Sequence, residues 1–332
     1  MSYSIGLDVS KSTIAVHISK NAQELEIAND SKGMQVLYAK LKKLYKKEID
    51  DVVFVFEPTG SYSELLRKFC AQKRIQCFII NPKRFSNYAK ALGEEIKNDR
   101  IDARVLAKAI ALATEDEIAV PTYDETVETL KELMGYYKFT VKQTAQMRNH
   151  LESLKAKAGN RFAIKELETS LKASKAKEKK IIEQVQALID ADERHRHAYE
   201  NILSIMGVGQ IGAIALLHLF LKYPEANQRQ VTSLAGLNPI YRQSGSSVQS
   251  GYRISKSGSK LYRGSLFMGV MSAIRYDKSF QAFYDRLKAN GKHTTQAQIA
   301  VMRKMIIVAH SLYKNNRKYD PEYALNKEKP VD

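Results

Sequence analysis

The fold of the first third of the chain is decided by residues 3–19, YSIGLDVSKSTIAVHIS. Two runs rich in apolar and β-branched residues flank a short polar connection, which predicts two strands joined by a tight turn. Three more runs of this kind follow, so the predicted strands are residues 3–9, 13–19, 24–28, 51–57 and 74–80.

Helix patterns separate the later strands. Residues 31–47 place apolar residues at helical spacing, and Ser31 is the predicted N-cap. Three consecutive strands, a helix, a strand, a helix and a strand predict a mixed sheet flanked by helices. This order is that of a ribonuclease H-like fold, and it also fits other α/β folds.

Beyond the sheet the chain is predicted to be mainly helical. A helix pattern begins at Asn98 and breaks near Pro121, where we place a domain boundary. Residues 124–190 contain no proline and predict two long helices, paired antiparallel around residues 157–162. The predicted inward positions are Val127, Leu130, Met134, Tyr137, Val141, Ile164, Leu167, Leu171, Ile181, Val185 and Leu188.

The predicted fold class is therefore α/β followed by all-α, in three domains. Residues 1–118 form the domain built on the sheet, residues 119–195 a helical coiled-coil arm, and residues 196–325 a mainly helical C-terminal domain. The lysine-rich faces of the arm indicate either a solvated spacer or a surface for nucleic acid or for a second copy of the chain.

The composition favours a polyanionic partner. The 332 residues contain 53 Lys and Arg against 36 Asp and Glu, a formal net charge of +17. A charge this far from balance is typical of proteins that bind nucleic acid, and a merely lysine-rich soluble protein is the alternative.

Cysteine usage and apolar runs indicate a cytoplasmic protein with no membrane partner. Cys70 and Cys77 fall on apolar stretches without a CxxC motif, so we interpret them as reduced core residues. No basic and then apolar leader precedes the first strand. The longest apolar run, Ile211–Leu221, is too short to span a bilayer.

Four carboxylates are predicted to converge at the sheet. Asp8 lies near the end of the first strand and Glu57 ends the fourth, and these strands are neighbours in a ribonuclease H-like sheet. Asp99 and Asp102 are three residues apart at the start of a helix, hence on one face. Four acids repel one another unless a hard cation neutralises them, so we predict Mg²⁺, with two ions suited to phosphodiester exchange and Mn²⁺ as a substitute.

Other interpretations of these acids stay open. An acid at a helix N-terminus also stabilises the helix dipole without binding metal, and an acid at a strand end is ordinary. The stretch around Asp8 also suits the phosphate-binding turn of an actin-like ATPase or sugar kinase. That fold needs a second glycine-rich turn, which the sequence lacks.

A second group of candidate residues lies in the last third of the chain. Gly207 and Gly209 form a G-x-G turn between apolar helix patterns, which predicts a helix-hairpin-helix that holds a phosphate through backbone N–H groups. A plain packing corner between two helices is the alternative.

The stretch 243–259 is rich in Gly and Ser and predicts a long functional loop. Around it lie cations that could hold phosphates and tyrosines on which bases could stack. Ser244, Ser246 and Ser247 could supply a nucleophile or serve as hydrogen-bonding linkers. The cations are Arg242, Arg253, Lys256, Lys260 and Arg263, and the tyrosines are Tyr241, Tyr252 and Tyr262.

These motifs together resemble the DEDD transposases of insertion-sequence family 110, from near the start of the chain to near its end. The motifs that carry the resemblance are IGLDVSK, EPTGSY, INPKRFSNYAKA, KNDRIDARVLA, GVGQIGA, LAGLNP, SGSSVQSGYRISKSGSKLYR and VMRKM. The family often has Lys-Thr-Asp where this chain has Lys97, Asn98 and Asp99. Asn is an equally good N-cap, so this departure leaves the expected site intact.

The resemblance implies a RuvC-like domain in which Asp8, Glu57, Asp99 and Asp102 hold the metal, and a transposase domain in which Ser244 is the nucleophile. It also implies donor and target DNA as substrates, a guide RNA, and a dimer or tetramer. The expected product is exchanged DNA strands, formed through a covalent 5′-phosphoserine intermediate. Two alternatives remain: a hydrolytic Holliday-junction endonuclease, and a non-catalytic scaffold that binds nucleic acid.

Overall fold

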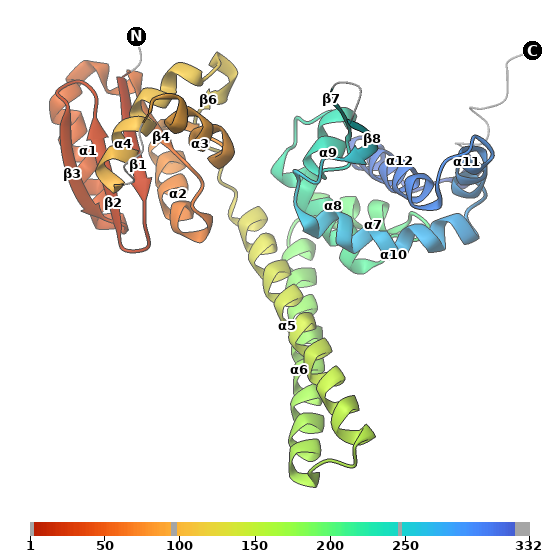
Figure 1. The fold of residues 1–332 in the computed structure, drawn as a ribbon. Helices are drawn as coiled ribbons and strands as arrows, with labels where there is room; N and C mark the ends of the chain where they lie inside the picture. The colour runs from red at the N-terminus through yellow and green to blue at the C-terminus, as the bar shows by residue number, and fades with distance from the viewer. Residues whose placement is uncertain (1–2, 94–97, 245–247, 323–332) are drawn as a thin grey trace, which may run out of the picture. The chain divides into compact units, whose positions relative to one another are not determined.

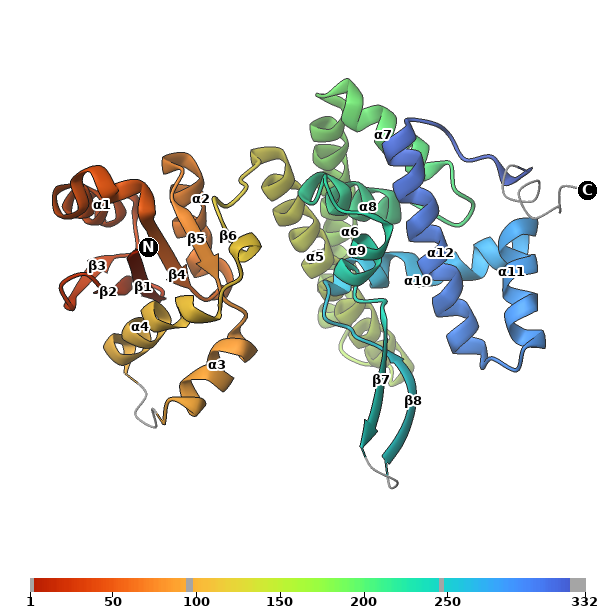
Figure 2. The ribbon, with the colours of Figure 1, turned by 90° about the horizontal axis from the view of Figure 1, so that it is seen from above.

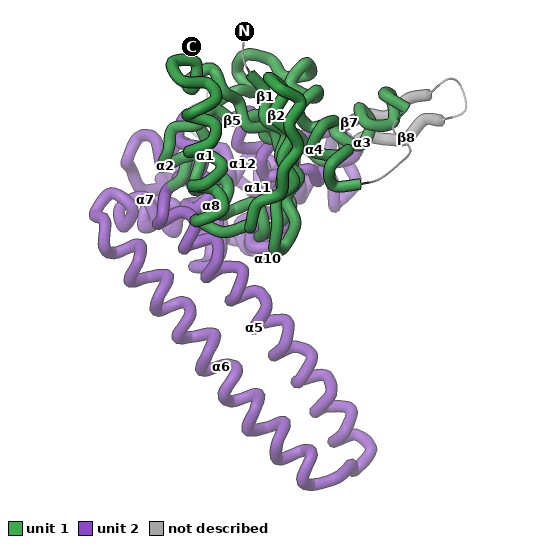
Figure 3. The backbone as a smooth tube through the Cα atoms, turned by 90° about the vertical axis from the view of Figure 1, so that its left-hand side faces the viewer, with its two compact units in different colours: residues 1–123 green, residues 124–332 purple. Residues whose placement is uncertain are grey.

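The computed structural model describes residues 3–93, 98–244 and 248–322, and the side chains of residues 241–252 lie outside that description. The chain forms two compact units, residues 1–123 and residues 124–332, drawn in different colours in Figure 3. The first unit is a mixed α/β domain and the second is mainly helical (Figure 1).

The first unit is built on a six-stranded sheet with the order β3-β2-β1-β4-β5-β6. β1, β2 and β3 pair antiparallel, β1, β4 and β5 pair parallel, and β6 adds antiparallel to β5. The strands are β1 (Tyr3–Val9), β2 (Thr13–Ile18), β3 (Gln23–Ala28), β4 (Val52–Phe56), β5 (Gln76–Ile79) and β6 (Ile118–Ala119). The five strands expected from the sequence are thereby confirmed, except that β4 ends at Phe56, so Glu57 is the first residue after the strand and not its last. The two-residue β6 was not predicted.

Burial follows the position of each strand in the sheet. All five residues of β4 are buried, as expected for a parallel strand covered on both faces. β3 lies at one edge of the sheet and exposes every second residue.

Two layers of helices cover this sheet (Figures 1 and 2). On one face α1 (Ser31–Tyr45) and α2 (Glu64–Lys73) pack their apolar residues against β1 and β4. On the other face lie α3 (Pro82–Ala91) and α4 (Asp99–Lys108). Short 3-10 turns cover Lys46–Asp51, Gly60–Ser63, Ala109–Leu112 and Glu115–Glu117.

One predicted helix cap is wrong. The N-cap of α1 is Asp30 and not Ser31, because the Asp30 carboxylate accepts the backbone N–H of Gly33 at 2.7 Å while Ser31 already belongs to the helix. A carboxylate at this position also favours the positive end of the helix dipole.

The second unit begins with a hairpin of two long helices, α5 (Glu125–Ala156) and α6 (Arg161–Asp190), as the proline-free stretch predicted. The inward position expected at Val141 is wrong, since this side chain is 37% exposed. The seam between the helices instead continues through Thr140, Thr144 and Leu151.

The rest of the second unit packs around α8 (Gln210–Lys222), in which every residue from Gly212 to Phe220 is buried. The apolar run at 211–221 is therefore a central core helix. The helices α7 (Glu193–Leu203), α10 (Lys260–Tyr276) and α12 (Thr294–Asn315) contact it directly. The same core also includes α9 (Gln228–Leu234) and α11 (Lys278–Ala289), and α11 packs against α10 and α12. Within the described ranges, no helix combines the length and the apolar character that a membrane crossing requires.

The Gly- and Ser-rich stretch is not the long loop that we expected. It forms a two-stranded antiparallel ribbon of β7 (Pro239–Ser244) and β8 (Val248–Ile254), seen clearly in Figure 2. The backbone groups that face each other across the two strands pair by hydrogen bonds, so a segment with few large apolar residues still forms regular secondary structure.

Candidate functional site

Asp8 and Glu57 lie opposite each other at the carboxyl ends of β1 and β4, the two central parallel strands. The register of β1 and β4 pairs Tyr3 with Val52 and Gly6 with Val55, and the same register continued brings residue 8 opposite residue 57. Residues opposite each other in a parallel pair project to the same side of the sheet. Both acids are half-buried.

The helix α4 covers β1 at very short range. A Cβ at Gly6 would lie 1.8 Å from the carbonyl oxygen of Ala103 and 2.6 Å from the backbone nitrogen of Ala107. Asp8 follows Gly6 by two residues and therefore faces the same side of the sheet. Asp102 directly precedes Ala103, so the contact that fixes the helix also fixes the carboxylate-bearing turn relative to β1.

Asp99 and Asp102 both lie in the first turn of α4. Asn98 is the N-cap, as predicted, and its side chain accepts the backbone N–H of Arg100 at 3.1 Å. Asp99 is exposed, whereas Asp102 is half-buried and shares a helix face with the fully buried Leu106. Lys97, the residue before the cap, lies outside the described residues.

The carboxylates do not form a closed metal site in the described part of the chain. Among those residues, no three His, Cys, Asp or Glu side chains are grouped so that they could hold a metal ion. The donor chemistry of the predicted set nevertheless suits Mg²⁺, which prefers oxygen ligands, because all four members are carboxylates.

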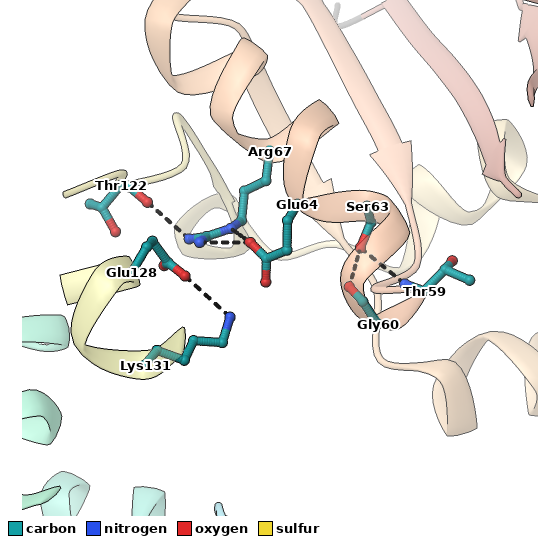
Figure 4. Close-up of polar contacts among 8 residues, drawn as sticks. All are labelled: Thr59, Gly60, Ser63, Glu64, Arg67, Thr122, Glu128 and Lys131. Atoms are coloured by element: carbon teal, nitrogen blue, oxygen red, sulfur yellow. Dashed lines mark hydrogen bonds and ion pairs between the residues drawn. The ribbon is translucent and has the colours of Figure 1, made fainter. Parts of the chain in front are cut away.

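The turn after Glu57 is held by its own hydroxyl groups. The hydroxyl of Ser63 accepts the backbone N–H of Thr59 at 3.1 Å and donates to the carbonyl of Gly60 at 3.3 Å (Figure 4). The Thr59 hydroxyl donates to the carbonyl of Glu57 itself at 3.3 Å. These bonds fix the direction in which the chain leaves β4.

Asn29 ties this turn to the one that follows Asp8. Its side-chain amide donates to the carbonyl of Ser10 at 2.8 Å and to the carbonyl of Tyr62 at 3.0 Å. The Oδ1 atom of Asn29 is buried and has no hydrogen-bond partner among the described residues. Sequence reasoning missed Asn29, because its partners are backbone groups that leave no signal in the side chains around it.

Ser244 is the last residue of β7 and pairs with Val248 of β8 across the ribbon. Its position puts it at the end of the ribbon that is distant from the helices (Figure 2). The side chains of Ser244, Arg242, Tyr241 and Tyr252 lie outside the description, and so do Ser246 and Ser247 as whole residues.

The remaining predicted cations have different surroundings. Arg253, Lys256 and Lys260 are exposed. Arg263 is half-buried, and one of its guanidinium nitrogens donates to the carbonyls of Ala235 at 2.8 Å and Gly258 at 3.0 Å. Arg263 thus joins α10 to the turn after α9, which is an architectural contact.

The G-x-G turn connects α7 to α8. Gly207 packs against α10, since a Cβ there would lie 2.2 Å from the carbonyl oxygen of Gly269. Gly209 is the N-cap of α8, and a Cβ there would meet no heavy atom within 4 Å. Gly207 therefore serves packing, and Gly209 is the more open of the two predicted phosphate-binding glycines.

Tyr262 is not the exposed stacking surface that we expected, since it is only 5% exposed. Its hydroxyl lies 3.0 Å from Nδ1 of His218, another buried residue. Burial lowers the pKa of His218 to about 4 and raises the pKa of Tyr262, so both groups are neutral near pH 7.

Two family models match this chain. Residues 5–155 match a model of the IS110 type described as "Transposase", and residues 199–285 match a model described as "Transposase IS116/IS110/IS902 family". The first match spans all four candidate carboxylates, and the second spans the G-x-G turn and the β7–β8 ribbon.

Similar proteins have related descriptions. The "Pilin gene-inverting protein" of Moraxella bovis is 28% identical over 326 residues, which cover 95% of this chain and 97% of the relative. Its counterpart in Moraxella lacunata is 27% identical over the same length. An IS110 insertion-element protein of Streptomyces coelicolor is 27% identical over 163 residues, which cover 48% of this chain and 38% of the relative.

Proposed function

Because the chain belongs to the IS116/IS110/IS902 family of transposases, we propose that it breaks and rejoins the DNA of an insertion sequence at specific sites. The pilin gene-inverting relatives extend over nearly the whole chain, so inversion of a DNA segment is one outcome open to the same chemistry. One observation carries the proposal: Asp8 and Glu57 lie opposite each other on the side of the sheet that is covered by α4, the helix that bears Asp99 and Asp102.

We propose a ribonuclease H-like, specifically RuvC-like, fold for the N-terminal domain. The strand order β3-β2-β1-β4-β5, with an antiparallel hairpin followed by parallel strands, supports it. The hairpin of α5 and α6 supports a coiled-coil arm, and α7, the G-x-G turn and α8 support a helix-hairpin-helix. The proposed domains are residues 1–118, 119–195 and 196–325.

In this proposal Asp8, Glu57, Asp99 and Asp102 hold Mg²⁺. Bound Mg²⁺ would neutralise the four carboxylates and stabilise negative charge on the oxygens of the phosphodiester being exchanged. The short contact between Gly6 and Ala103 keeps the turn that carries Asp102 close to β1, and the bonds of Asn29 hold the turns that follow the two strand acids.

Ser244 acts as the nucleophile. Its Oγ attacks the phosphorus of a DNA phosphodiester, the bond from phosphorus to the 3′ oxygen breaks, and the serine proton ends on the released 3′ hydroxyl. A 3′ hydroxyl from another strand then attacks the phosphoserine, which rejoins the DNA and restores the serine. The energy of the phosphodiester bond is kept in the intermediate, so rejoining needs no nucleotide hydrolysis.

The partners of this reaction are double-stranded donor and target DNA, a structured guide RNA and further copies of the chain. The net charge of +17 supports binding to nucleic acid. A dimer or tetramer would bring two pairs of half-sites together for strand exchange.

A plasmid assay tests the proposal. The purified protein with its co-purified RNA is incubated with Mg²⁺ and a supercoiled plasmid that carries the two ends of the insertion sequence. We expect sequencing of the products to find new junctions at which the DNA has been recombined. Nicked or linear plasmid without new junctions would contradict the proposal and favour a hydrolytic endonuclease.

A further inference from the structure

A cavity of about 340 Å³ lies at the base of the β7–β8 ribbon. It opens between the end of α8, the end of α9 and the turn that leads into α10. The residues that matter for its chemistry are Lys222, Tyr223, Leu234, Ser257, Ser259 and Tyr262. Its volume is near the lower end of the range of about 300–1,000 Å³ that is usual for small-molecule sites.

The walls of this cavity are fixed by the packing of the turn. A Cβ at Gly258 would lie 1.8 Å from the carbonyl oxygen of Leu234, so the turn lies directly on the end of α9. The backbone N–H of Lys256 donates to Gly236 at 3.0 Å, and Arg263 binds the carbonyl of Gly258. The cavity is therefore already formed in the structure, so a ligand need not organise it.

Tyr262 forms a rigid floor. Its ring lies nearly parallel to that of His218, with an interplanar angle of 27°, and its hydroxyl is hydrogen-bonded to the same histidine. With both groups neutral, the floor carries no charge that would repel an anion.

The lining has an apolar part and a cationic, hydroxyl-bearing part. Leu234 and the half-buried ring of Tyr223 supply the apolar surface. Lys222 supplies a positive charge, with its Nζ 5.6 Å from the centre of the Tyr223 ring, and Ser257 and Ser259 supply hydroxyls. A nucleotide combines a flat base, which stacks on an aromatic ring, with a phosphate, which pairs with a cation.

We propose that this cavity receives one unstacked nucleotide of a nucleic-acid strand, with its base against Tyr223 and its phosphate near Lys222. The proposal rests on the nucleic-acid binding that the proposed function requires. A strand is favoured over a free nucleotide because the exposed Lys256 and Lys260 flank the turn and can contact neighbouring phosphates. β7 extends from this region to Ser244 over about 17 Å, the length of about five stacked nucleotides.

Binding of a bulged duplex tests this site in the full-length protein. The probe is a 20-base-pair DNA with one extrahelical 2-aminopurine, and the matched probe is the same duplex fully paired. We expect tighter binding of the bulged probe, with a change in 2-aminopurine fluorescence. Tyr223→Ala and Lys222→Gln should each weaken binding of the bulged probe by about tenfold and leave the paired probe unchanged. Tyr223→Phe, which retains the ring, should bind like the wild type.

Matched controls are Tyr276→Ala and Lys278→Gln, two exposed residues of the same unit outside the cavity, which should have no effect. Equal binding of both probes by wild type and variants would overturn the nucleotide site while leaving the proposed function in place. Displacement of the bulged probe by deoxyadenosine monophosphate at the same concentration as the probe would overturn it in favour of a free-nucleotide site. Failure to bind any nucleic acid would overturn both proposals.

Discussion

Gly6 and Ala103 are so close that position 6 has no room for a side chain: a Cβ there would lie 1.8 Å from the Ala103 carbonyl oxygen. Gly6→Ala should therefore push α4 off the sheet and lower the free energy of unfolding by about 1–3 kcal/mol or more. Urea denaturation followed by circular dichroism measures this. The control is Gly135→Ala, at an exposed helix position with no atom near the new Cβ, which should raise stability by about 0.5–1 kcal/mol. A Gly6→Ala protein as stable as the wild type would contradict the close packing.

Asn29→Ala should impair catalysis while leaving the overall fold intact. The change removes the two bonds that hold the turns after Asp8 and Glu57, so the carboxylates lose their fixed positions. We expect kcat for strand cleavage to fall by about tenfold or more with KM for DNA little changed. Asn21→Ala, in the exposed turn between β2 and β3, is the matched control. A change confined to KM would show that Asn29 acts in substrate binding instead.

The proposed Mg²⁺ site predicts that Mg²⁺ stabilises the wild type but not the acid variants. Mg²⁺ that binds only the folded protein raises its melting temperature. Asp8→Asn and Glu57→Gln should remove this rise and abolish cleavage, without lowering the melting temperature in EDTA, because the neutral variants have less charge repulsion. The exposed Glu26→Gln serves as control. An unchanged Mg²⁺ response in both acid variants would rule out these carboxylates as ligands.

The buried pair of His218 and Tyr262 predicts a specific loss of stability in acid. Burial lowers the pKa of His218 from 6.5 to about 4, so between these values the unfolded chain takes up a proton that the folded chain does not. The free energy of unfolding is therefore unaffected by this group above pH 6.5 and falls by about 3 kcal/mol as the pH drops to about 4.

Calorimetry of His218→Asn between pH 4 and pH 8 checks this prediction. Asn keeps a polar atom near the Tyr262 hydroxyl and does not titrate, so the variant should lose less stability in acid than the wild type. His150→Asn, at an exposed position of α5, is the control and should retain the wild-type slope. Equal slopes in all three proteins would show that His218 does not titrate as its burial implies.

The elements with strong periodic patterns were predictable from the sequence. β1 spans the residues that the apolar and β-branched run indicated, and Asn98 caps α4 at the residue where the helix pattern begins. Such features depend on residues close together in the chain. To predict that Asp8 and Glu57 lie opposite each other, only the order of the strands in the sheet was needed in addition.

Features that depend on partners distant in sequence were not predictable. The β7–β8 ribbon is stabilised by backbone pairing, which Gly and Ser do not signal. Val141 fits a helical repeat, yet the seam of the hairpin passes through Thr140 and Thr144, where the Thr144 hydroxyl lies 2.8 Å from that of Ser174 on the facing helix. The bonds of Asn29 and the cavity at Tyr223 are formed by segments that are distant in the sequence and adjacent in the fold.

The most direct test of the account is a search for the covalent link between Ser244 and DNA. The DNA carries its label at the 3′ end of the cleaved strand, on the segment that keeps the cleaved phosphate. When this DNA is incubated with Mg²⁺, the wild-type protein and its co-purified RNA, it should give a labelled adduct that survives denaturing electrophoresis. Ser244→Ala should abolish this adduct while nucleic-acid binding stays within about twofold of the wild type. An adduct that persists in Ser244→Ala, or recombination that proceeds without any adduct, would contradict the assignment of Ser244 as the nucleophile.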